Sequence, residues 1–205
     1  MNREVDETVA ALMDKIFLEI VMAPSFTQRA VEILSSKKNR IILRRRIGGA
    51  DGSSYRSMLG GVLWQERDSS TETAAGMKPV TTRHPSDEEY QDMVFANKIV
   101  KHSRSNAIVL AKGKQLCASG IGQTSRIDAL HQAIDKARAF GFALDGAVMA
   151  SDAFFPFADS VTMAHEAGIS AVVQPGGSVR DQESIDYCNK TGVAMVFTGV
   201  RHFKH

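Results

Sequence analysis

The second half of the chain alternates short apolar runs with amphipathic stretches, and this alternation constrains the fold more than any other feature. The strand-like runs are residues 106–111, 115–119, 146–150, 169–173 and 193–198. Helical spacing of apolar residues fills the intervals between them, with the last two predicted helices at 159–167 and 181–191. Short strands that alternate with helices are typical of an α/β sheet covered by helices on both faces.

Local signals mark where several of these elements begin and end. Ser86 followed by Glu89 has the form of a capping box, which predicts a helix directly after it. A glycine turn at 112–114 joins the first two strands as a hairpin. Ser125 begins the next helix, and Gly141 ends it.

The first 80 residues are interpreted as an N-terminal helix and strand segment followed by a connector, with the α/β domain at 81–205. The expected elements are a helical stretch from residue 6 that becomes strand-like at 17–22, a helix at 27–37, a strand at 41–43 and a polar loop at 48–54. Residues 66–78 are rich in Ser, Thr and Glu. We expect this connector to have little to pack against.

The overall composition argues against two classes of partner. With 43% hydrophobic and 23% charged residues, the 205-residue chain can bury a sizeable core. The formal net charge of +2 is too small for a nucleic-acid surface or a membrane-binding face. No apolar run approaches the roughly 18 to 20 residues that span a bilayer. The one basic block, residues 44–46, is interpreted as a solvated strand edge.

The two cysteines indicate a reducing compartment. Cys117 and Cys188 lie far apart and form no Cys-x-x-Cys pair, and the polar N-terminus shows no signal peptide. We therefore expect free thiols in a cytoplasmic protein. A zinc deaminase needs His-x-Glu and Pro-Cys-x-x-Cys motifs, and neither occurs, so no metal is expected.

Polar and glycine-containing stretches recur at the ends of the predicted strands. They are residues 105–106, 120–123, 175–178 and 201–205. The glycine turns are expected to place backbone N–H groups and helix N-termini where an anion could sit. Simpler interpretations stay open: the Gly-x-Gly at 120–122 as a tight turn, the basic tail as a frayed terminus, and Lys101-His102 as a complement to a helix dipole.

An aromatic segment, residues 149–157, follows the predicted strand at 146–150. It holds three of the ten phenylalanines around Pro156, with Asp152 and Asp159 beside them. The rings can form a core plug between strand and helix, where burial of each ring stabilises by about 1.5 to 3 kcal/mol. They can also line a ligand pocket, because open α/β sheets bind ligands beyond the carboxyl ends of their strands. Both interpretations can hold at once.

Taken together, the motifs resemble the C-terminal part of AICAR transformylase, found in the bifunctional AICAR transformylase/IMP cyclohydrolase family of purine synthesis. The matching stretches are 101–109, 122–126, 151–157, 174–181 and 197–205, together with 17–25 and 59–68. The resemblance covers nearly the whole chain. It implies a cytidine-deaminase-like fold, a three-layer α-β-α sheet, with an added N-terminal helical segment.

The resemblance also implies an activity. The family enzyme transfers a formyl group from 10-formyltetrahydrofolate, used as a co-substrate, to the 5-amino group of AICAR ribotide, in IMP biosynthesis. Its site is shared across a dimer interface. The implied partners are therefore AICAR ribotide, a folate and a second protein chain, with no nucleic acid and no membrane.

Site residues carry over from the family motifs one at a time. The implied catalytic residues are His205 and Asn106; Arg201, Asn106 and Phe203 would bind the substrate; and Arg126, Ile127, Phe154, Pro156, Phe157 and Asp159 would bind the folate. Phe155 is expected to pack inward. The residue types suit these roles, because Arg offers a charge-assisted fork to phosphate and Asp accepts from the donor edge of a pterin.

Departures from the family pattern limit the resemblance. The family's catalytic pair lies in a Lys-His-x-x-Pro-Cys-Gly motif that does not occur here, and Lys101-His102 aligns with a different family segment. No cyclohydrolase domain is recognised. Ala158 stands where the family usually has Arg, and Ala118-Ser119 replaces part of a glycine-rich turn.

These observations lead to three hypotheses. The chain is the C-terminal half of a formyltransferase, completed as a homodimer or by a chain that carries the Lys-His half. Alternatively, it is a binding or regulatory module that retains nucleotide or folate affinity without catalysis. A purely structural dimerisation domain is least favoured, because the polar motif residues occur together.

Overall fold

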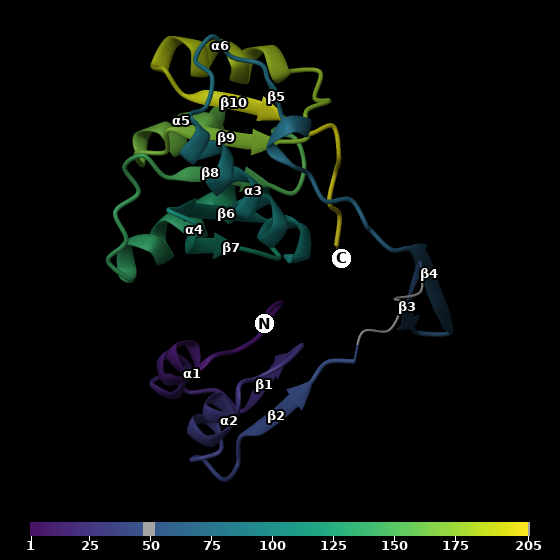
Figure 1. Ribbon diagram of the computed structural model, residues 1–205. Helices are drawn as coiled ribbons and strands as arrows, with labels where there is room; N and C mark the ends of the chain where they lie inside the picture. Colours follow the sequence, from purple (N-terminus) through teal and green to yellow (C-terminus); the bar gives the residue numbers. More distant parts are fainter. Residues whose placement is uncertain (47–51, 205) are drawn as a thin grey trace. The chain divides into compact units, whose positions relative to one another are not determined.

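The computed structural model describes residues 1–46 and 52–204, and it divides the chain into two compact units, 1–67 and 68–205 (Figure 1). The boundary falls after Arg67 rather than at residue 80, where the sequence placed it. The reason is that the connector packs on the second unit. Met77 lies in the core of the second unit and is 3% exposed. Residues Lys78–Pro79 pair with the last strand of that unit, Ala194–Phe197.

The second unit contains one six-stranded sheet with the strand order β5-β10-β9-β8-β6-β7. Its strands are β5 (Lys78–Pro79), β6 (Ile108–Lys112), β7 (Gln115–Gly120), β8 (Val148–Ser151), β9 (Ala171–Gln174) and β10 (Ala194–Phe197). β8, β9 and β10 are parallel, whereas β6 is antiparallel to β7 and β8, and β5 is antiparallel to β10. The five strands predicted between 106 and 198 are confirmed, and the sheet is mixed.

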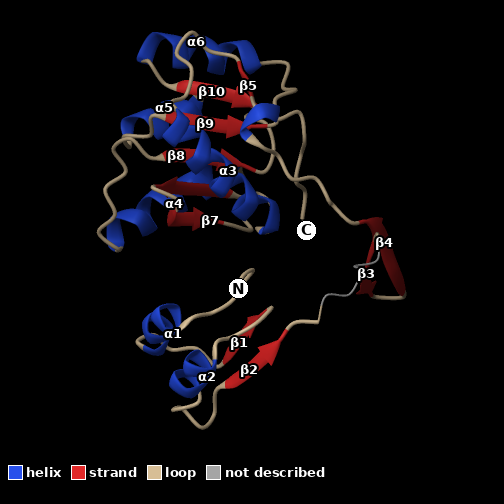
Figure 2. Ribbon diagram, viewed as in Figure 1, coloured by secondary structure: helices blue, strands red, loops and turns tan. Residues whose placement is uncertain are grey.

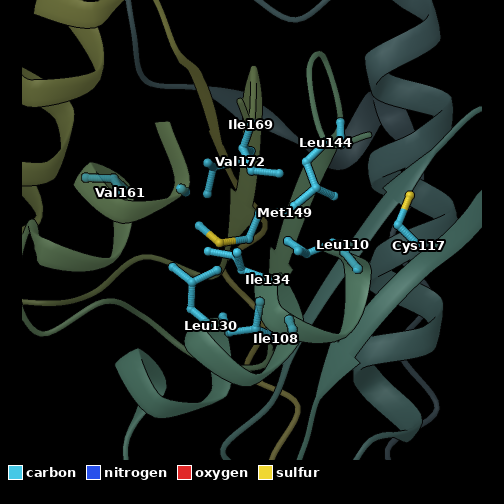
Figure 3. Packing of buried hydrophobic residues seen from close by; sticks show 14 of the residues in the cluster. Ile108, Leu110, Cys117, Leu130, Ile134, Leu144, Met149, Val161, Ile169 and Val172 are labelled. Atoms are coloured by element: carbon cyan, nitrogen blue, oxygen red, sulfur yellow. The ribbon is translucent and has the colours of Figure 1, made fainter. Parts of the chain in front are cut away.

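Helices cover both faces of this sheet, as Figure 2 shows with strands in red and helices in blue. They are α3 (Asp87–His102), α4 (Arg126–Ala139), α5 (Asp159–Glu166) and α6 (Asp181–Thr191). Alternate residues of β6 point to opposite faces, as a strand's period of two requires. Ile108 and Leu110 pack with α4 and α5 (Figure 3), while Val109 and Ala111 pack with α3.

The predicted helix boundaries are confirmed by their caps. Ser86 and Glu89 form the complete capping box of α3, and the Ser125 side chain accepts a hydrogen bond from the Asp128 N–H at the start of α4. Gly141 has a φ of +74°, a conformation that ends a helix readily only with glycine. These local signals are set by neighbouring residues, so they could be identified from sequence.

The first unit contains four short elements and a hairpin. They are α1 (Glu7–Asp14), β1 (Ile20–Ala23), α2 (Gln28–Leu34) and β2 (Ile41–Arg44), then β3 (Ser53–Met58) and β4 (Gly61–Glu66). β1 and β2 pair in parallel, and Val5, Ala10, Val21, Ala30 and Leu34 are among the buried residues of a small core. Arg44, Arg45 and Arg46 are exposed, which agrees with a solvated edge.

The β3–β4 hairpin was not predicted. Residues 48–51 of the expected polar loop lie outside the described residues, and Ser53 and Ser54 belong to β3 instead. Strand β3 pairs with β4 through a two-residue turn at Leu59 and Gly60. The sequence of β3 does not predict a strand, because it has no regular alternation of apolar and polar residues.

Candidate functional site

The carboxyl ends of β7, β8, β9 and β10 and the leading end of β6 meet at one edge of the sheet, which we call the carboxyl edge. The arrangement follows from strand direction: β8, β9 and β10 are parallel, and Ile108 at the start of β6 pairs with both Gly120 and Ser151. The stretches that the sequence identified at strand ends therefore lie at a common edge. In an α/β sheet, this is the edge where ligands bind.

Asn106 connects two of these stretches. Its side-chain Nδ2 donates to the carbonyl oxygens of Gln123 at 3.0 Å and Thr124 at 3.2 Å. Both protons of the amide are used to hold the loop between β7 and α4. The arrangement leaves Oδ1 of Asn106 as an acceptor at the edge.

Arg126 lies at the start of α4 against a buried carboxylate. Its Nη2 lies 3.3 Å from Oδ1 of Asp152, a residue that is 0% exposed. Burial lowers the pKa of Arg126, Asp152 raises it, and the positive charge of Arg201 lowers it further. Within the described residues, Nε of Arg126 and Oδ2 of Asp152 have no hydrogen-bond partner. The charges at this position are only partly compensated.

The aromatic segment after β8 is split between core and surface. Phe155 is 0% exposed and packs in the core, as expected. The guanidinium of Arg201 lies 4.7 Å from the centre of the Phe154 ring, and that of Arg180 lies 4.6 Å from the centre of the Phe157 ring. Two rings therefore each carry a cation on their faces.

Three other residues expected at the folate pocket lie on the same elements. Ile127 and Pro156 are half-buried, and Asp159 is exposed at the start of α5. Oδ1 of Asp159 accepts from the backbone N–H of Ser160 at 2.7 Å. Ala158 is half-buried and packs against the core, so no charged group follows Phe157 before Asp159.

The expectation that the glycine turns present free N–H groups to an anion is wrong for six backbone N–H groups of the two turns, because these groups donate to acceptors within the protein. In the 175–178 turn, the carboxylate of Asp181 accepts from Gly177 at 2.7 Å and Ser178 at 3.1 Å, and Gln174 accepts from Gly176 at 3.2 Å.

In the turn after β7, Gly122 donates to Arg104 O at 2.8 Å, and the Ile121 N–H donates to the Gln132 side chain at 3.0 Å. The N–H of Gln123 donates to Asn106 O at 3.3 Å. The protein's own acceptors use these backbone donors.

The C-terminal tail is held in place through residue 204, so the frayed-tail interpretation is wrong for that stretch. The backbone of Lys204 exchanges hydrogen bonds with Ser105, and the His202 N–H donates to Asp152 O at 2.9 Å. Arg201 and Phe203 are exposed at the edge. His205, the expected catalytic residue, lies outside the described residues.

Sequence reasoning missed His202. This residue is 2% exposed, and its two ring nitrogens lie 2.6 Å from Asp68 Oδ2 and 3.1 Å from Glu72 Oε2. Side chains alternate in direction along an extended segment. With Arg201 and Phe203 facing outward, this alternation could have predicted that His202 faces inward.

Lys101 belongs to the same region and is used structurally. Its Nζ lies 3.5 Å from Asp68 Oδ1 and also binds the carbonyl oxygen of Ser70. His102 is exposed at the end of α3, and its carbonyl oxygen accepts from the Lys204 ammonium at 3.3 Å. The Lys101-His102 pair therefore holds the connector and tail at the end of the helix.

Neither cysteine is suited to act as a nucleophile. Cys117 and Cys188 are free and buried. Burial raises the pKa of both thiols, that of Cys188 to about 12, so both are protonated near neutral pH. In residues 1–46 and 52–204, no group of three or more His, Cys, Asp or Glu side chains is arranged to hold a metal ion, and none of the helices has the length and apolar character to cross a membrane.

Comparison with known proteins identifies relatives across the whole chain. The family model described as the AICARFT/IMPCHase bienzyme matches residues 1–136. Proteins named bifunctional purine biosynthesis protein PurH are 57% identical over 204 residues in Bacteroides thetaiotaomicron and 52% identical over 208 residues in Acetivibrio thermocellus. In each case the match covers 100% of this chain and 40% of the relative.

A solved structure from Thermotoga maritima, a diaminohydroxyphosphoribosylaminopyrimidine deaminase/5-amino-6-(5-phosphoribosylamino)uracil reductase, is a distant neighbour. It has a TM-score of 0.38 and 20% sequence identity, and the match covers 52% of this chain and 34% of that one. A similarity at this level supports no conclusion about fold or function.

Proposed function

Because the chain belongs to the AICARFT/IMPCHase bienzyme family, we propose that it is the C-terminal half of an AICAR formyltransferase. The reaction is transfer of a formyl group from 10-formyltetrahydrofolate to the amino group of AICAR ribotide, in IMP biosynthesis. The observation that carries the proposal is the meeting of Arg126, Arg201 and the Phe154 ring at the carboxyl edge. Both ligands combine a planar ring system with anionic groups, and this edge offers an aromatic face and two cations.

The nucleotide phosphate is assigned to Arg201. Its guanidinium is exposed and has no carboxylate partner among the described residues, whereas Arg126 shares its charge with Asp152. A guanidinium offers paired donors that match phosphate geometry. Because the turn N–H groups are already used, removal of Arg201 would leave little to replace it.

Asn106 is assigned as a hydrogen-bond acceptor for the substrate. Its Nδ2 protons are both donated to the loop at 123–124, so a substrate group would meet Oδ1. The reacting amino group of AICAR ribotide is a donor, and the two are complementary. His205 and Phe203 would complete the substrate side.

The folate is assigned to the surface formed by Arg126, Ile127, Phe154, Pro156, Phe157 and Asp159. Asp159 uses Oδ1 to bind Ser160, and Oδ2 has no hydrogen bond within the described part of the chain. This second oxygen can accept from the donor edge of a pterin. Ala158 leaves the surface one arginine short of the family pattern, which would weaken attraction for an anionic cofactor.

The proposal requires a contribution from outside these 205 residues. The chain spans 40% of the length of the relatives described above, and it has no Lys-His-x-x-Pro-Cys-Gly motif. We propose that a part of the protein carrying this motif completes the site in the cytoplasm, either on a different chain or in a homodimer of a longer polypeptide that contains both parts. The covered sheet of residues 68–204 is proposed to be a cytidine-deaminase-like three-layer fold, and the packing of α3 opposite α4 and α5 supports this.

The test is reconstitution. The chain would be mixed with the portion of the B. thetaiotaomicron relative that lies outside the match, and formation of formyl-AICAR ribotide would be followed by mass spectrometry. We expect product in the mixture and none from either part alone. Absence of product with this partner and with the corresponding part of the A. thermocellus relative would overturn the proposal. A parallel assay for ring closure to IMP by this chain alone is expected to be negative.

A binding or regulatory module is the second candidate. It is favoured by one observation: Arg126 and Arg201 are present while the Lys-His motif is not. Calorimetry distinguishes the two cases, because a module binds AICAR ribotide or a folate but supports no turnover in any mixture. If neither ligand binds to the chain or to the mixture, both candidates fail.

A further inference from the structure

His202 is a buried histidine held between two carboxylates of the connector. Its side chain is 1% exposed, with Nδ1 2.6 Å from Asp68 Oδ2 and Nε2 3.1 Å from Glu72 Oε2. The carboxylates are fixed in turn by α3: Asn97 donates to Glu72 at 2.8 Å, and Lys101 lies 3.5 Å from Asp68. The connector is more than 100 residues from His202 in sequence, since the two pairs are separated by 134 and 130 positions.

This geometry fixes the protonation state of the imidazole. An ionised carboxylate only accepts hydrogen bonds, and a neutral imidazole has a single N–H. A neutral ring would therefore direct a lone pair at one of the two carboxylates inside a buried site. An imidazolium donates to both, and together with Lys101 it balances the two negative charges.

His202 also lies directly beside a residue of the proposed site. Its backbone N–H donates to Asp152 O at 2.9 Å, on the segment that carries Phe154. The preceding residue, Arg201, then extends the opposite way and lies over the Phe154 ring at 4.7 Å. Rotation of the tail at His202 would move Arg201 off this ring.

We infer that His202, as an imidazolium bound by Asp68 and Glu72, is the positioning residue that holds Arg201 over Phe154 for anion binding. The inference rests on the proposed function in assigning an anionic ligand to Arg201. It adds the means by which the connector, through His202, holds that cation in place. Exposed arginines lose much side-chain freedom when they bind, and a tail fixed beforehand reduces that cost.

Charged groups from two elements surround His202 and Asp68. Asp68 and Glu72 face the ring from the connector, Lys101 faces Asp68 from α3, and Asp152 contributes its carbonyl oxygen. The burial of Asp68 raises its pKa, but the hydrogen bond and charge of His202 and the charge of Lys101 lower it overall. Gain of a proton by Asp68 at low pH would weaken its interaction with His202 and loosen the tail.

The experiment uses nuclear magnetic resonance of the full chain, which reads both parts of the inference without a ligand. We expect two protonated nitrogens on His202 at neutral pH. We also expect the side-chain signals of Arg201 to be shifted by the Phe154 ring current. The Arg180 side chain over Phe157, at 4.6 Å, is a matched internal control far from His202 in the sequence.

In His202→Gln, the Arg201 shift should fall towards the value of an unstacked arginine, while the Arg180 shift stays. Asp68→Asn changes a side chain that is 35% exposed, and it should shift the Arg201 signal in the same direction by a smaller amount. This variant replaces His202→Gln in the test if His202→Gln does not fold.

A single protonated nitrogen on His202 in the unsubstituted chain would overturn the inference. So would an unchanged Arg201 shift in folded His202→Gln, or equal changes in Arg201 and Arg180. In the mixture with the complementary chain, His202→Gln should lower the affinity for AICAR ribotide about tenfold. Failure of the unsubstituted mixture to bind this ligand would overturn the proposed function. The protonation of the His202 nitrogens and the ring-current shift of Arg201 are measured without ligand, so they test the positioning role independently.

Discussion

The two edges of the six-stranded sheet both contain charged residues, but they use them differently. At the opposite edge, which we call the amino edge, a groove is lined by Arg83, Glu89, Asp92, Lys112 and Ser170, among others. Glu89 accepts from Arg83 at 2.7 and 2.9 Å and from Ser170 at 2.6 Å, and Asp92 accepts from two backbone N–H groups of the β6–β7 turn. These two carboxylates are satisfied by the protein itself.

At the carboxyl edge, by contrast, the charged groups are not fully paired within the protein. Among residues 1–46 and 52–204, Arg201 interacts with a ring face rather than with a carboxylate, and neither Nε of Arg126 nor Oδ2 of Asp152 has a hydrogen-bond partner. The comparison teaches that the presence of charge does not identify a site. A charged group without an oppositely charged partner is a candidate for ligand binding only where it is exposed, as Arg201 is. Substitutions at the amino edge should therefore change stability, and substitutions of the exposed cation at the carboxyl edge should change binding.

The largest effect is expected for Glu89→Ala at the amino edge. The change removes the partner of Arg83, Ser170 and the Ser86 N–H at a side chain that is 10% exposed. We expect the free energy of unfolding to fall by about 3 kcal/mol, because hydrogen bonds to a charged group contribute about 1.5 to 3 kcal/mol each and the Arg83 side chain, 39% exposed, can regain water. Urea denaturation measures it, with exposed Glu88→Ala as the control. A loss equal to that of the control would contradict the comparison.

The same carboxylate should give the chain an acid-sensitive stability. Burial raises the pKa of Glu89, but the bonds from Ser170, Arg83 and Ser86 lower it overall, below its usual value of 4.5. A group with a lowered folded-state pKa stabilises the protein above its unfolded pKa, and that stabilisation is lost as pH falls through the folded value. Denaturation at a series of pH values should show this decline, and Glu89→Gln should reduce its slope.

The next effect is expected for Arg201→Ala at the carboxyl edge. In the mixture with the complementary chain, the affinity for AICAR ribotide should fall about 10- to 100-fold, which corresponds to a charge-assisted hydrogen bond of about 1.5 to 3 kcal/mol. Unfolding should change by less than about 0.5 kcal/mol, since Arg201 is exposed. Arg138→Ala, an exposed arginine on α4, is the control for calorimetry. If the two variants bind equally, Arg201 is not the phosphate ligand.

A smaller effect is expected for Asp92→Asn, again at the amino edge. The carboxylate accepts from Gly113 at 2.8 Å and Lys114 at 2.6 Å, and an amide retains one of its two acceptors. The free energy of unfolding should fall by about 1 kcal/mol. Ligand affinity in calorimetry should not change. A change in affinity without a change in stability would place a ligand at this edge instead.

The smallest effect is expected for Ala158→Arg. The substitution adds a cation beside Phe157, at a position that is half-buried and packs against the core. We expect folate affinity to rise a few-fold, since a partly exposed ion pair contributes about 0.2 to 1 kcal/mol. Ala158→Gln, of similar length and no charge, is the control. Equal folate affinities for the two variants would show that a charge at position 158 does not contribute to folate binding.

Much of the second unit could be predicted from sequence because its signals are local. The alternation that begins at residue 106 identified five strands, and the caps at Ser86 and Ser125 fixed two helix starts. The placement of Asn106, Arg126 and Arg201 at a common edge also follows from strand direction, once the parallel order of β8, β9 and β10 is assumed.

What sequence could not supply depends on contacts between distant residues. The connector was expected to have little to pack against, yet Glu72 binds His202 and Asn97. Its polar composition gave no sign of a partner 130 positions away. The glycine turns were predicted as anion sites because their own sequence does not reveal that Gln132 uses one of the donors. Local patterns define elements, and long-range pairing decides which polar groups stay available.

The most direct test of the central claim is a map of ligand contacts on both edges. In the isotopically labelled chain, mixed with its unlabelled complementary chain, addition of AICAR ribotide should shift the magnetic resonance signals of Asn106, Arg126 and Arg201. The amide signals of Gly113 and Lys114 at the amino edge should not move. Shifts confined to the amino edge, or absent from both edges at saturating ligand, would contradict the assignment of the carboxyl edge as the binding site.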